Sequence, residues 1–429
     1  MPAGARLLPL IVHTGAMLPG DRRLLSPVGD GGSAPLSGDP SASDAAASSG
    51  DAARPVSPVA TAQHALTLLP GMESVLGSIF RDVERAERRV DIETYIYRDD
   101  MLGRSFGEMM ERAAARGVRT RLLYDPLGSQ ETDAPFFDDL RRRGVEVRAY
   151  RPMAVALGEG GLLPRDHSRV IVIDEVAYTG GAAWGDEWLP QRRGGEGWHD
   201  VCLRVDGPCV ADFAFLFEQR WREADGEPGR LLDYATGRKY PDLELIADTP
   251  DDNARVYARH REAIRRSKER VWIENAYFFP PAGMLKDLVD AARRGVDVQI
   301  ILPGETDLPI IKRAARAEYA TWIDRGFKLH EYDRAVLHSK FALVDRDWCT
   351  IGTFNANPSS LSAVNEVNLF VFDPAFVARV ADMFARDRAA SRPITRGALA
   401  ARPLLDKGVD WLAHGALSLL DKLVKTSPD

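Results

Sequence analysis

The sequence predicts an α/β fold in which two duplicated domains, each an α/β/α sandwich, are related by a pseudo-two-fold axis and share an active site at their interface. Three observations lead to this prediction. A histidine, a serine and a cation, followed five residues after the cation by an aspartate, occur twice, beginning at His167 and at His338. Helical and strand patterns alternate along most of the chain. Blocks of the second half also repeat blocks of the first in the same order.

The repeated blocks share one internal order, which is a helix, a glycine that ends it, and a hydrophobic strand. AAARGVRTRLLYD matches AARRGVDVQIILPG and places Gly117 opposite Gly295. DIETYIY matches WIENAYFF and places Glu93 opposite Glu274. Strands that alternate with helices in this way predict a mostly buried sheet covered by helices. Duplicated halves commonly pack about a two-fold axis, so a site built from both halves would lie on that axis.

Four segments are expected along the 429 residues. Residues 1–60 are rich in Ala, Gly, Pro and Ser and are predicted to be a disordered tail, because such a segment buries too little apolar surface to offset its ordering entropy. Residues 61–235 and 236–392 are the two predicted domains, each within the usual size range. Residues 393–429 are predicted to form an amphipathic helical segment.

The C-terminal segment carries an apolar stripe at helical spacing. Two interpretations of this stripe stay open. The helix could pack its stripe on the body of the protein, or it could lie in a membrane surface, which Trp411 and the nearby lysines favour and the aspartates oppose. The stripe consists of Leu405, Val409, Leu412, Ala416, Leu419 and Leu423.

The composition is that of a soluble globular protein without an overall positive charge. The formal charge of -7 is unlike that of most nucleic-acid binders, so no nucleic-acid partner is expected. No stretch reaches the roughly 18 apolar residues that a membrane-spanning helix needs, so any action on a membrane would take place from its surface. Cys202, Cys209 and Cys349 lack metal-ligand spacing and fit a reducing compartment.

The repeated histidine motif combines groups suited to cleaving a phosphodiester. Side chains alternate along a strand, so each histidine shares a face with the cation two residues on, Arg169 or Lys340. Imidazole can act as nucleophile, acid or base, and a fixed cation beside it can bind an anion. Two copies around one pocket would let one histidine attack phosphorus while the other protonates the leaving oxygen.

Two carboxylates are candidates to hold the histidines, because a nucleophilic imidazole needs an acceptor on its other nitrogen. Asp200 lies in GWHDVCLRV after His167, and Glu366 lies in VNEVNLFVF after His338, at comparable places in the two halves. The sequence contains no H-E-x-x-H motif and no C-x-x-C pair. Neither a metal nor another cofactor is therefore expected.

Two copies of an H-x-K-x-x-x-x-D motif, the first with arginine in place of lysine, make the chain resemble the phospholipase D superfamily. The surrounding sequence resembles the bacterial cardiolipin synthase branch of that superfamily. The resemblance covers residues 61–392 and includes the order of the motifs as well as their content. The stretches that carry it are IETYIYRDD, HSRVIVID, TGGAAWGDEWL, GWHDVCLRVDGP, ENAYFFPP, RRGVDVQIILPG and HSKFALVDRDWCTIGTFNANPSSL.

This resemblance implies a phosphatidyltransferase that joins two phosphatidylglycerols into cardiolipin and releases glycerol through a covalent phosphohistidine. It implies that His167 attacks phosphorus, and that His338 protonates the leaving alcohol and then acts as base on the incoming one. It also implies a peripheral protein at the cytoplasmic face of the bacterial cell membrane, with anionic phospholipid as partner. The further roles it implies are phosphate contacts from Arg169, Lys340 and Asn355, and bracing of the site by Asp174 and Asp345.

The first half departs from the family pattern at two positions. Arg169 stands where the family has lysine, and Ala183 stands where the usual G-G-x-N sequence would place its asparagine. Arginine keeps the charge but has a longer and flatter fork, and the loss of the asparagine removes a phosphate donor. The first half is therefore expected to be tuned to a variant substrate or to have reduced activity.

Several other residues are candidates for the site. Glu93 and Glu274 end matched strands, where polar residues often line a ligand crevice, and are expected to bind substrate or to brace a loop or the interface between the halves. His199 is expected to be structural. The apolar stretches at 153–166 and 278–281 are expected to form lips of a lipid-accepting mouth.

Alternative functions are kept beside the transferase. A phospholipase D-type hydrolase would share the covalent intermediate and release phosphatidic acid. A nuclease of the same superfamily is disfavoured by the acidic charge. An impaired or non-catalytic lipid-binding protein is motivated by Arg169 and Ala183. The sequence does not specify an oligomeric state.

Overall fold

The structure, a computed structural model, describes residues 57–152, 165–226, 240–249, 254–361 and 364–424. The predicted N-terminal tail lies almost wholly outside the described residues. The same holds for most of the apolar stretch at 153–166 and for the expected domain boundary at 235/236.

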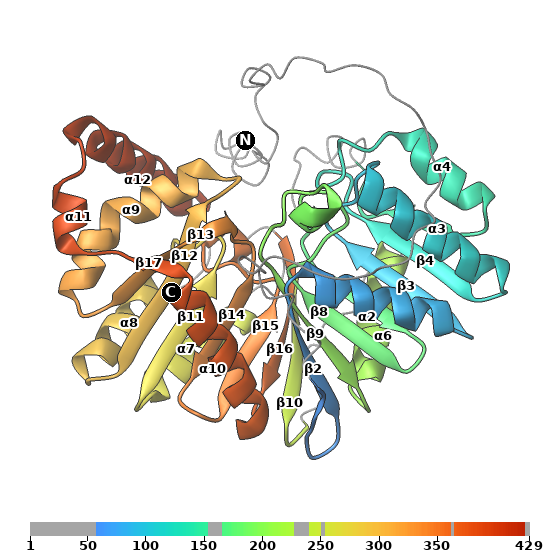
Figure 1. The fold of residues 1–429 in the computed structure, drawn as a ribbon, viewed down its shortest axis with the longest axis horizontal. Coiled ribbons are helices and arrows are strands. Elements are labelled where there is room, and N and C mark those ends of the chain that lie inside the picture. The colour runs from blue at the N-terminus through green and yellow to red at the C-terminus, as the bar shows by residue number, and fades with distance from the viewer. Residues whose placement is uncertain (1–56, 153–164, 227–239, 250–253, 362–363, 425–429) are drawn as a thin grey trace, which may run out of the picture.

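Two halves lie side by side, the first coloured blue to green and the second yellow to red (Figure 1). The first half contains β1 (Val59–Ala60), β2 (Ala65–Pro70), α2 (Met72–Arg85), β3 (Arg89–Thr94), α3 (Met101–Ala115), β4 (Arg119–Tyr124), α4 (Ala134–Arg142), β5 (Glu146–Ala149), β6 (Arg165–Asp166), β7 (Val170–Ile173), β8 (Val176–Gly180), β9 (Val201–Asp206) and α6 (Val210–Glu223). The second half contains β10 (Leu243–Asp248), α7 (Arg255–Arg266), β11 (Arg270–Asn275), α8 (Ala282–Arg293), β12 (Asp297–Glu305), α9 (Pro309–Asp324), β13 (Lys328–Val336), β14 (Lys340–Val344), β15 (Trp348–Gly352), β16 (Val364–Val371), α10 (Pro374–Ala389), β17 (Ser391–Pro393), α11 (Arg396–Ala400) and α12 (Leu404–Val424).

Each half is built on one mixed sheet, and seven strands follow the same order in both sheets, with β1 added at one edge of the first and β17 at the opposite edge of the second. The order is β1-β2-β9-β8-β7-β3-β4-β5 in the first half and β10-β16-β15-β14-β11-β12-β13-β17 in the second. In both, the central strand, β3 or β11, pairs in parallel with one neighbour and antiparallel with the other. This matched topology confirms the predicted duplication. The short strand β6 connects the two halves, because it belongs to the first half but pairs with β16 of the second.

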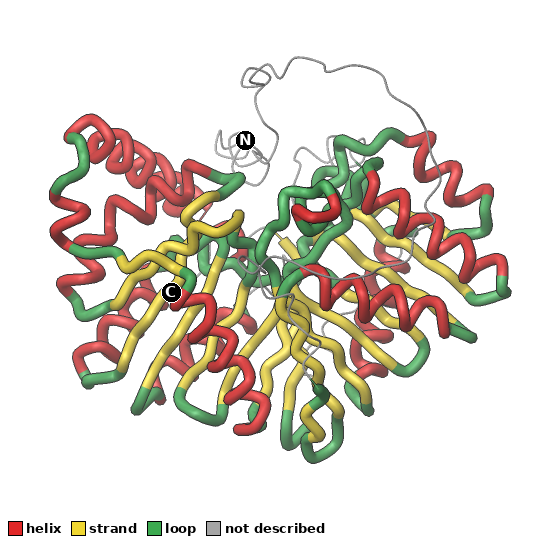
Figure 2. Tube along the Cα trace, in the orientation of Figure 1, coloured by secondary structure: helices red, strands yellow, loops and turns green. Residues whose placement is uncertain are grey.

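The sheets are covered by helices that the sequence pattern places on them. Gly117 lies just after the end of α3, and Gly295 lies just after the end of α8. Each has a φ of 88°, a backbone conformation that glycine adopts without strain. Apolar residues of α2, α3 and α4 form one core of the first half, and α7, α8 and α9 form the matching core of the second. Figure 2 shows the strands of both sheets converging toward the middle of the molecule, with most helices on the flanks.

The two halves share a third core, which is built around α6 and α10. Phe213 and Phe217 from α6 belong to the same buried cluster as Phe376 and Phe384 from α10. Each helix covers its own sheet and also contacts an edge strand of the other half, α6 against β10 and α10 against β2. Because apolar burial is the main favourable term in folding, this shared core fixes the halves against each other.

The aspartates that end the two histidine motifs occupy tight turns. Asp174 follows β7 and Asp345 follows β14, each with a positive φ, 46° and 51°. The carboxylate of Asp174 accepts hydrogen bonds from the backbone N–H groups of residues 87, 88 and 89 at 2.8 to 3.0 Å. Asp345 accepts from residues 268, 269 and 270 at 2.7 to 3.1 Å. Each aspartate thus ties a turn to the start of the central strand, at the far end of a strand from its histidine.

We predict that Asp345→Ala lowers the free energy of unfolding by about 2 to 3 kcal/mol, because it removes a charged acceptor of backbone N–H groups and strains a left-handed residue. Asp345→Asn should cost roughly half as much, because asparagine tolerates that backbone conformation and keeps one acceptor oxygen. Urea denaturation measures both effects. Loss of turnover in a variant of unchanged stability would instead give Asp345 a direct part in the chemistry.

Candidate active site

The two motif histidines lie where the halves meet, and each is held by a carboxylate of the opposite half. Nδ1 of His167 is 3.1 Å from Oε2 of Glu366, and Nδ1 of His338 is 2.7 Å from Oδ2 of Asp200. The sequence places both carboxylates at comparable positions but does not reveal this exchange. The exchange means that neither half contains a complete histidine–carboxylate pair.

The backbone repeats the same exchange. The N–H of His167 donates to the carbonyl oxygen of Asn365 at 3.1 Å, and the N–H of His338 donates to that of His199 at 2.8 Å. Asn365 and His199 each directly precede the carboxylate that holds the same histidine. One short segment therefore fixes both the main chain and the ring of the histidine from the other half.

In each half, a tyrosine ring lies against the histidine and near the cation. The centroid of Tyr95 is 5.2 Å from that of His167 and 5.6 Å from the guanidinium carbon of Arg169. The ring of Tyr277 lies 5.9 Å from the histidine and 5.6 Å from the lysine nitrogen of the second motif. These spacings permit edge-to-face packing and cation–π attraction, so the tyrosines restrict how the rings and cations can move.

The two cations differ in the donors that they leave free. Nη1 of Arg169 donates to the carbonyl oxygen of His167 at 2.6 Å, and the ammonium of Lys340 donates to that of His338. Nε and Nη2 of Arg169 are buried without a hydrogen-bond partner among the described residues. Because buried donors are nearly always paired, these two N–H groups mark a place for an anion.

The asparagine position is also unequal in the two halves. Asn355 lines the cleft of the candidate site and is buried, and its Oδ1 has no partner among the described residues. Ala183, at the corresponding place in the first half, is buried in the core of that half beside Trp184. The first half therefore offers an additional N–H from Arg169 and lacks the side-chain amide.

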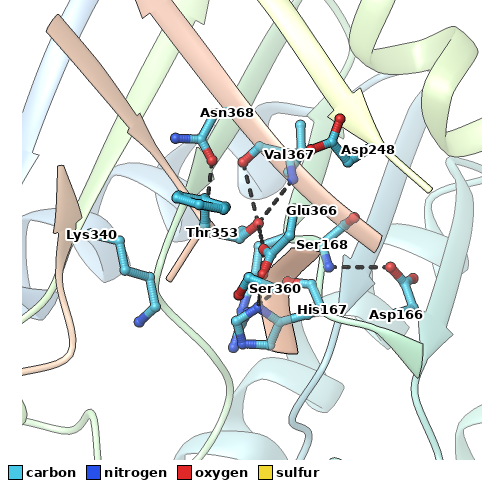
Figure 3. A network of polar contacts seen from close by, with 12 residues as sticks. Asp166, His167, Ser168, Asp248, Lys340, Thr353, Ser360, Glu366, Val367 and Asn368 are labelled. Atoms are coloured by element: carbon cyan, nitrogen blue, oxygen red, sulfur yellow. Dashed lines mark hydrogen bonds and ion pairs between the residues drawn. The ribbon is translucent and has the colours of Figure 1, made fainter. Parts of the chain in front are cut away.

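The pKa values of His167 and Glu366 are both shifted far from their ordinary values. Burial, followed by the charges of Arg169 and Lys340, lowers the pKa of His167 well below its ordinary value. Burial also raises the pKa of Glu366 to about 8, although hydrogen bonds from hydroxyl groups oppose the shift. Figure 3 shows the Glu366 carboxylate between the ring of His167 and the hydroxyl of Thr353, which donates to it. The imidazole is therefore favoured in its neutral form.

The pair of His338 and Asp200 is different. Burial and the charge of Lys340 lower the pKa of His338, while Asp200 opposes this shift. Burial would raise the pKa of Asp200, but His338 and Lys340 outweigh burial and lower it to about 2. The indole N–H of Trp188 donates to the same carboxylate at 3.0 Å. A fully ionised acceptor so held can stabilise an imidazolium better than Glu366 can.

His199 lies in a buried charged cluster behind His338. Its Nε2 is 3.4 Å from Asp387 and 3.6 Å from Glu274, and these three form the one group of possible metal ligands found among the described residues. Burial would lower the pKa of His199, but Asp387 and Glu274 outweigh burial and raise it to about 9. The three side chains therefore form a buried ion cluster in which the imidazole is favoured as a cation. This placement agrees with the structural role expected for His199.

The structure places Glu93 and Glu274 beneath the histidine motifs rather than in the cleft. Both are buried, with exposed fractions of 1% and 0%. Burial and the nearby Asp166 raise the pKa of Glu93, and Glu274 accepts a hydrogen bond from the hydroxyl of Ser339. Their burial favours the bracing interpretation over substrate binding, since Glu274 bonds to Ser339 of the second motif and Glu93 lies beside Asp166, directly before the first motif. The position of a residue at the end of a strand does not determine whether its side chain reaches the cleft.

An open cleft of about 790 Å³ lies over the two histidines. His167, Arg169, His338, Asn355 and Glu366 contribute to its surface. Apolar side chains from both halves complete the wall, and polar groups stand at its edge. The apolar lining residues are Ile96, Leu127, Trp198, Leu308, Ile311 and Val364, and the polar ones at the edge include Arg98, Gln130 and Glu131.

The apolar lip expected from residues 278–281 is not part of this cleft. Phe278 is buried in the second core against Trp322, and Phe279 packs beside His414 of α12. The short Phe-Phe-Pro-Pro run therefore serves packing, because both rings find partners inside the protein. The other expected lip, at 153–164, lies outside the described residues.

Sequence reasoning missed four residues that organise the site. Trp188 and Trp198 lie with their ring centroids 5.3 and 5.6 Å from that of His338. Thr353 bonds to Glu366, and Asp387 forms the ion cluster described above. The tryptophans and the threonine fall in or beside stretches that carry the family resemblance. No pattern in the sequence points to Asp387, which lies far along the chain on α10.

Comparison with known proteins agrees with this geometry. The family model described as "Cardiolipin synthase, PLD-like domain" matches residues 79–221 and 261–388. The chain is 32% identical over 322 residues to a cardiolipin synthase of Geobacillus kaustophilus, covering 73% of this chain and 64% of that protein. It is 32% identical over 325 residues to cardiolipin synthase B of Salmonella typhimurium, covering 72% of this chain and 77% of that protein.

A solved structure shows the same fold at low sequence identity. The phosphatidylserine synthase of Haemophilus influenzae superposes with a TM-score of 0.63 at 14% identity, covering 84% of this chain and 94% of that one. The matched family model covers both halves, including both histidine motifs and both carboxylates. The chain therefore belongs to the cardiolipin synthase-like branch of the phospholipase D superfamily.

Proposed function

We propose that this protein is a phosphatidyltransferase that joins two phosphatidylglycerols into cardiolipin and releases glycerol. The observation that carries the proposal is the convergence of two carboxylate-held histidines and the buried cation Arg169 on one cleft, with Lys340 buried against Tyr277, which also lines it. The relatives named as cardiolipin synthases support the choice of reaction. The apolar walls of the cleft support a lipid rather than a sugar or nucleotide substrate.

In the first step, Nε2 of His167 attacks the phosphorus of a bound phosphatidylglycerol. The bond between phosphorus and the glycerol oxygen breaks, and His338 donates its proton to that oxygen. The neutral form of His167 supports its role as nucleophile. The ionised Asp200 supports the role of His338 as acid, because it stabilises the imidazolium before transfer.

In the second step, the neutral His338 accepts the proton of a hydroxyl group on a second phosphatidylglycerol. The resulting oxygen nucleophile attacks phosphorus, the bond between His167 and phosphorus breaks, and cardiolipin leaves. Arg169, Lys340 and Asn355 would stabilise the charge that builds on the phosphoryl oxygens in both steps. This chemistry requires no metal.

Both proposed substrates are membrane lipids, so the protein would work at a membrane surface. No helix among the described residues is long and apolar enough to cross a bilayer. Peripheral attachment at the cytoplasmic face stays a prediction from the family resemblance.

The first prediction concerns the product. With phosphatidylglycerol in mixed micelles and without added metal, the protein should release glycerol and form cardiolipin, and chelator should not change the rate. His167→Ala should abolish both products and serves as the control. Phosphatidic acid as the sole lipid product would favour the hydrolase. Failure to turn over any phosphodiester would favour the non-catalytic alternative.

The same assay tests the assignment of the two histidines. In a His338→Ala variant, glycerol departs without an acid and the second step lacks a base, so phosphate should accumulate on His167. Mass spectrometry of the acid-labile adduct identifies the modified residue. If the adduct instead forms on His338 in a His167→Ala variant, and no adduct forms on His167 in the His338→Ala variant, then His338 is the nucleophile and His167 the acid and base.

The second prediction concerns pH. Since the pKa of Glu366 is about 8, its carboxyl group is protonated below that pH and can donate to Nδ1 of His167, which leaves the proton of the neutral ring on Nε2 and prevents Nε2 from attacking. Formation of the covalent intermediate should therefore rise with pH and level off above about 8. Glu366→Gln should remove this rise and lower the plateau by roughly 10²- to 10⁴-fold, because an amide can fix the wrong tautomer.

The matched control for this pH prediction is Asp200→Asn. It should leave the rise near pH 8 in place, because Asp200 is already ionised far below that range. Rapid-quench measurement of the first turnover gives both profiles. A rise near pH 8 that persists in Glu366→Gln would assign the titration to another group, of which Lys340, with a pKa lowered to about 7 by burial, is the nearest candidate.

The third prediction concerns the departures at Arg169 and Ala183. If the free N–H groups of Arg169 replace the missing amide, Arg169→Lys should lower kcat by about 10²- to 10³-fold, the range expected for one donor to a developing negative charge. The double variant Arg169→Lys with Ala183→Asn should recover part of that loss, because it restores the family pair. Steady-state kinetics on micellar lipid measure both variants. Equal or higher activity in Arg169→Lys alone would mean that arginine crowds the site.

A further inference from the structure

The C-terminal helix α12 has its apolar stripe on the outside of the protein. Of the eight large hydrophobic side chains that are exposed among the described residues, six belong to α12. Leu405 is 80% exposed, Leu412 is 76% exposed and Trp411 is 54% exposed. The helix does pack on the body of the protein, against α9, but through its other face, and the apolar stripe itself faces outward. Figure 1 shows α12 at the edge of the second half, lying along α9.

The exposed arc of the helix is apolar without interruption. Within residues 404–419, every exposed position carries an apolar side chain or is a glycine, and none is charged. These positions span about 22 Å at the usual helical rise. They are Leu404, Leu405, Gly408, Val409, Trp411, Leu412, Gly415, Ala416 and Leu419.

Within residues 404–419, the polar side chains of the same helix are buried or half-buried. Asp410 is buried and pairs with Arg402 at 2.7 Å and with Arg313 of α9 at 3.4 Å. His414 lies 3.5 Å from Glu318 of α9. A helix on a water-soluble surface has the opposite arrangement, with charges outward and apolar residues inward. The medium that this arc fits is therefore not water.

The arc lies close to the candidate site. Ala413 and Leu417 of α12 pack in one cluster with Tyr277, Leu308 and Ile311. The last three also line the cleft, so one layer of side chains separates α12 from the lipid site. A surface that contacts the arc would stand beside the wall of the cleft.

We propose that the exposed arc of α12 docks the protein on the surface of a lipid bilayer and so brings the cleft to its substrates. This inference rests on the lipid substrate of the proposed function. Leucines with a tryptophan on one face are typical of helices that lie in the interfacial layer of a membrane. A second copy of the chain fits less well, because six side chains of one helix are far fewer than the roughly 20 to 30 residues a side of a stable interface.

The test compares the full chain with a Leu405→Gln and Leu412→Gln double variant. Both side chains are exposed, so the fold should not change, which circular dichroism checks. Cosedimentation with vesicles of phosphatidylglycerol and phosphatidylcholine should show binding by the parent protein. The double variant should bind at least tenfold more weakly, and high salt should affect the parent little, since the arc carries no charge. Met101→Gln, which changes an exposed methionine on α3, is the matched control and should bind like the parent.

Activity separates this inference from the proposed function. The double variant should keep the turnover of the parent on lipid dispersed in detergent micelles and lose it on vesicles. Vesicle binding that is unchanged in the double variant, or absent in the parent, would overturn the docking surface. A parent dimer that the double variant dissociates, with vesicle binding unchanged, would assign the arc to a second copy. If the parent shows no turnover in micelles, the proposed function fails, whereas the cosedimentation result still decides the docking surface.

Discussion

The exchange of partners between two histidines and two carboxylates is the constraint on which the rest of the structure depends. Each motif histidine is held from the other half by a carboxylate at its ring and by a carbonyl group that accepts from its backbone N–H. Hydrogen bonds of this kind weaken within a fraction of an ångström, so the halves must be held rigidly against each other. The core around α6 and α10 and the pairing of β6 with β16 supply that rigidity. The interface between the halves is therefore at once the most packed and the most chemically important part of the molecule.

The symmetry of this frame would by itself make the two histidines equivalent, and the charges around them remove the equivalence. Asp200 is ionised and receives a second hydrogen bond from Trp188, whereas burial keeps the proton affinity of Glu366 high. An imidazole beside the first carboxylate is better suited to hold a proton, and one beside the second is better suited to be neutral. A duplicated fold thus gains two chemical roles through small differences in burial and hydrogen bonding, without a change in geometry.

The sequence predicts the features that depend on periodicity and fails where the outcome depends on contacts between distant segments. Alternating helices and strands and the repeated motifs predict the duplicated sheets, and the same repeat predicts that Asp200 and Glu366 occupy equivalent places. It cannot reveal that they exchange histidines, because strand periodicity gives the face of a sheet but not the neighbour across it. For the same reason, the sequence does not reveal that Glu93 and Glu274 are buried beneath the motifs rather than in the cleft. The sequence predicts a C-terminal helix with an apolar stripe, but helical spacing does not say which medium the stripe meets.

Transfer and hydrolysis share the phosphohistidine, so the chemistry of the histidines cannot decide between them. The decision depends on which hydroxyl group reaches His338 first, that of a second lipid or that of water. A cleft with apolar walls disfavours water. A protein held on a bilayer meets acceptor lipid at a far higher local concentration than one in solution. Docking through the proposed arc of α12 would thereby favour transfer, and the reaction would be set by the fold around the site as much as by the site itself.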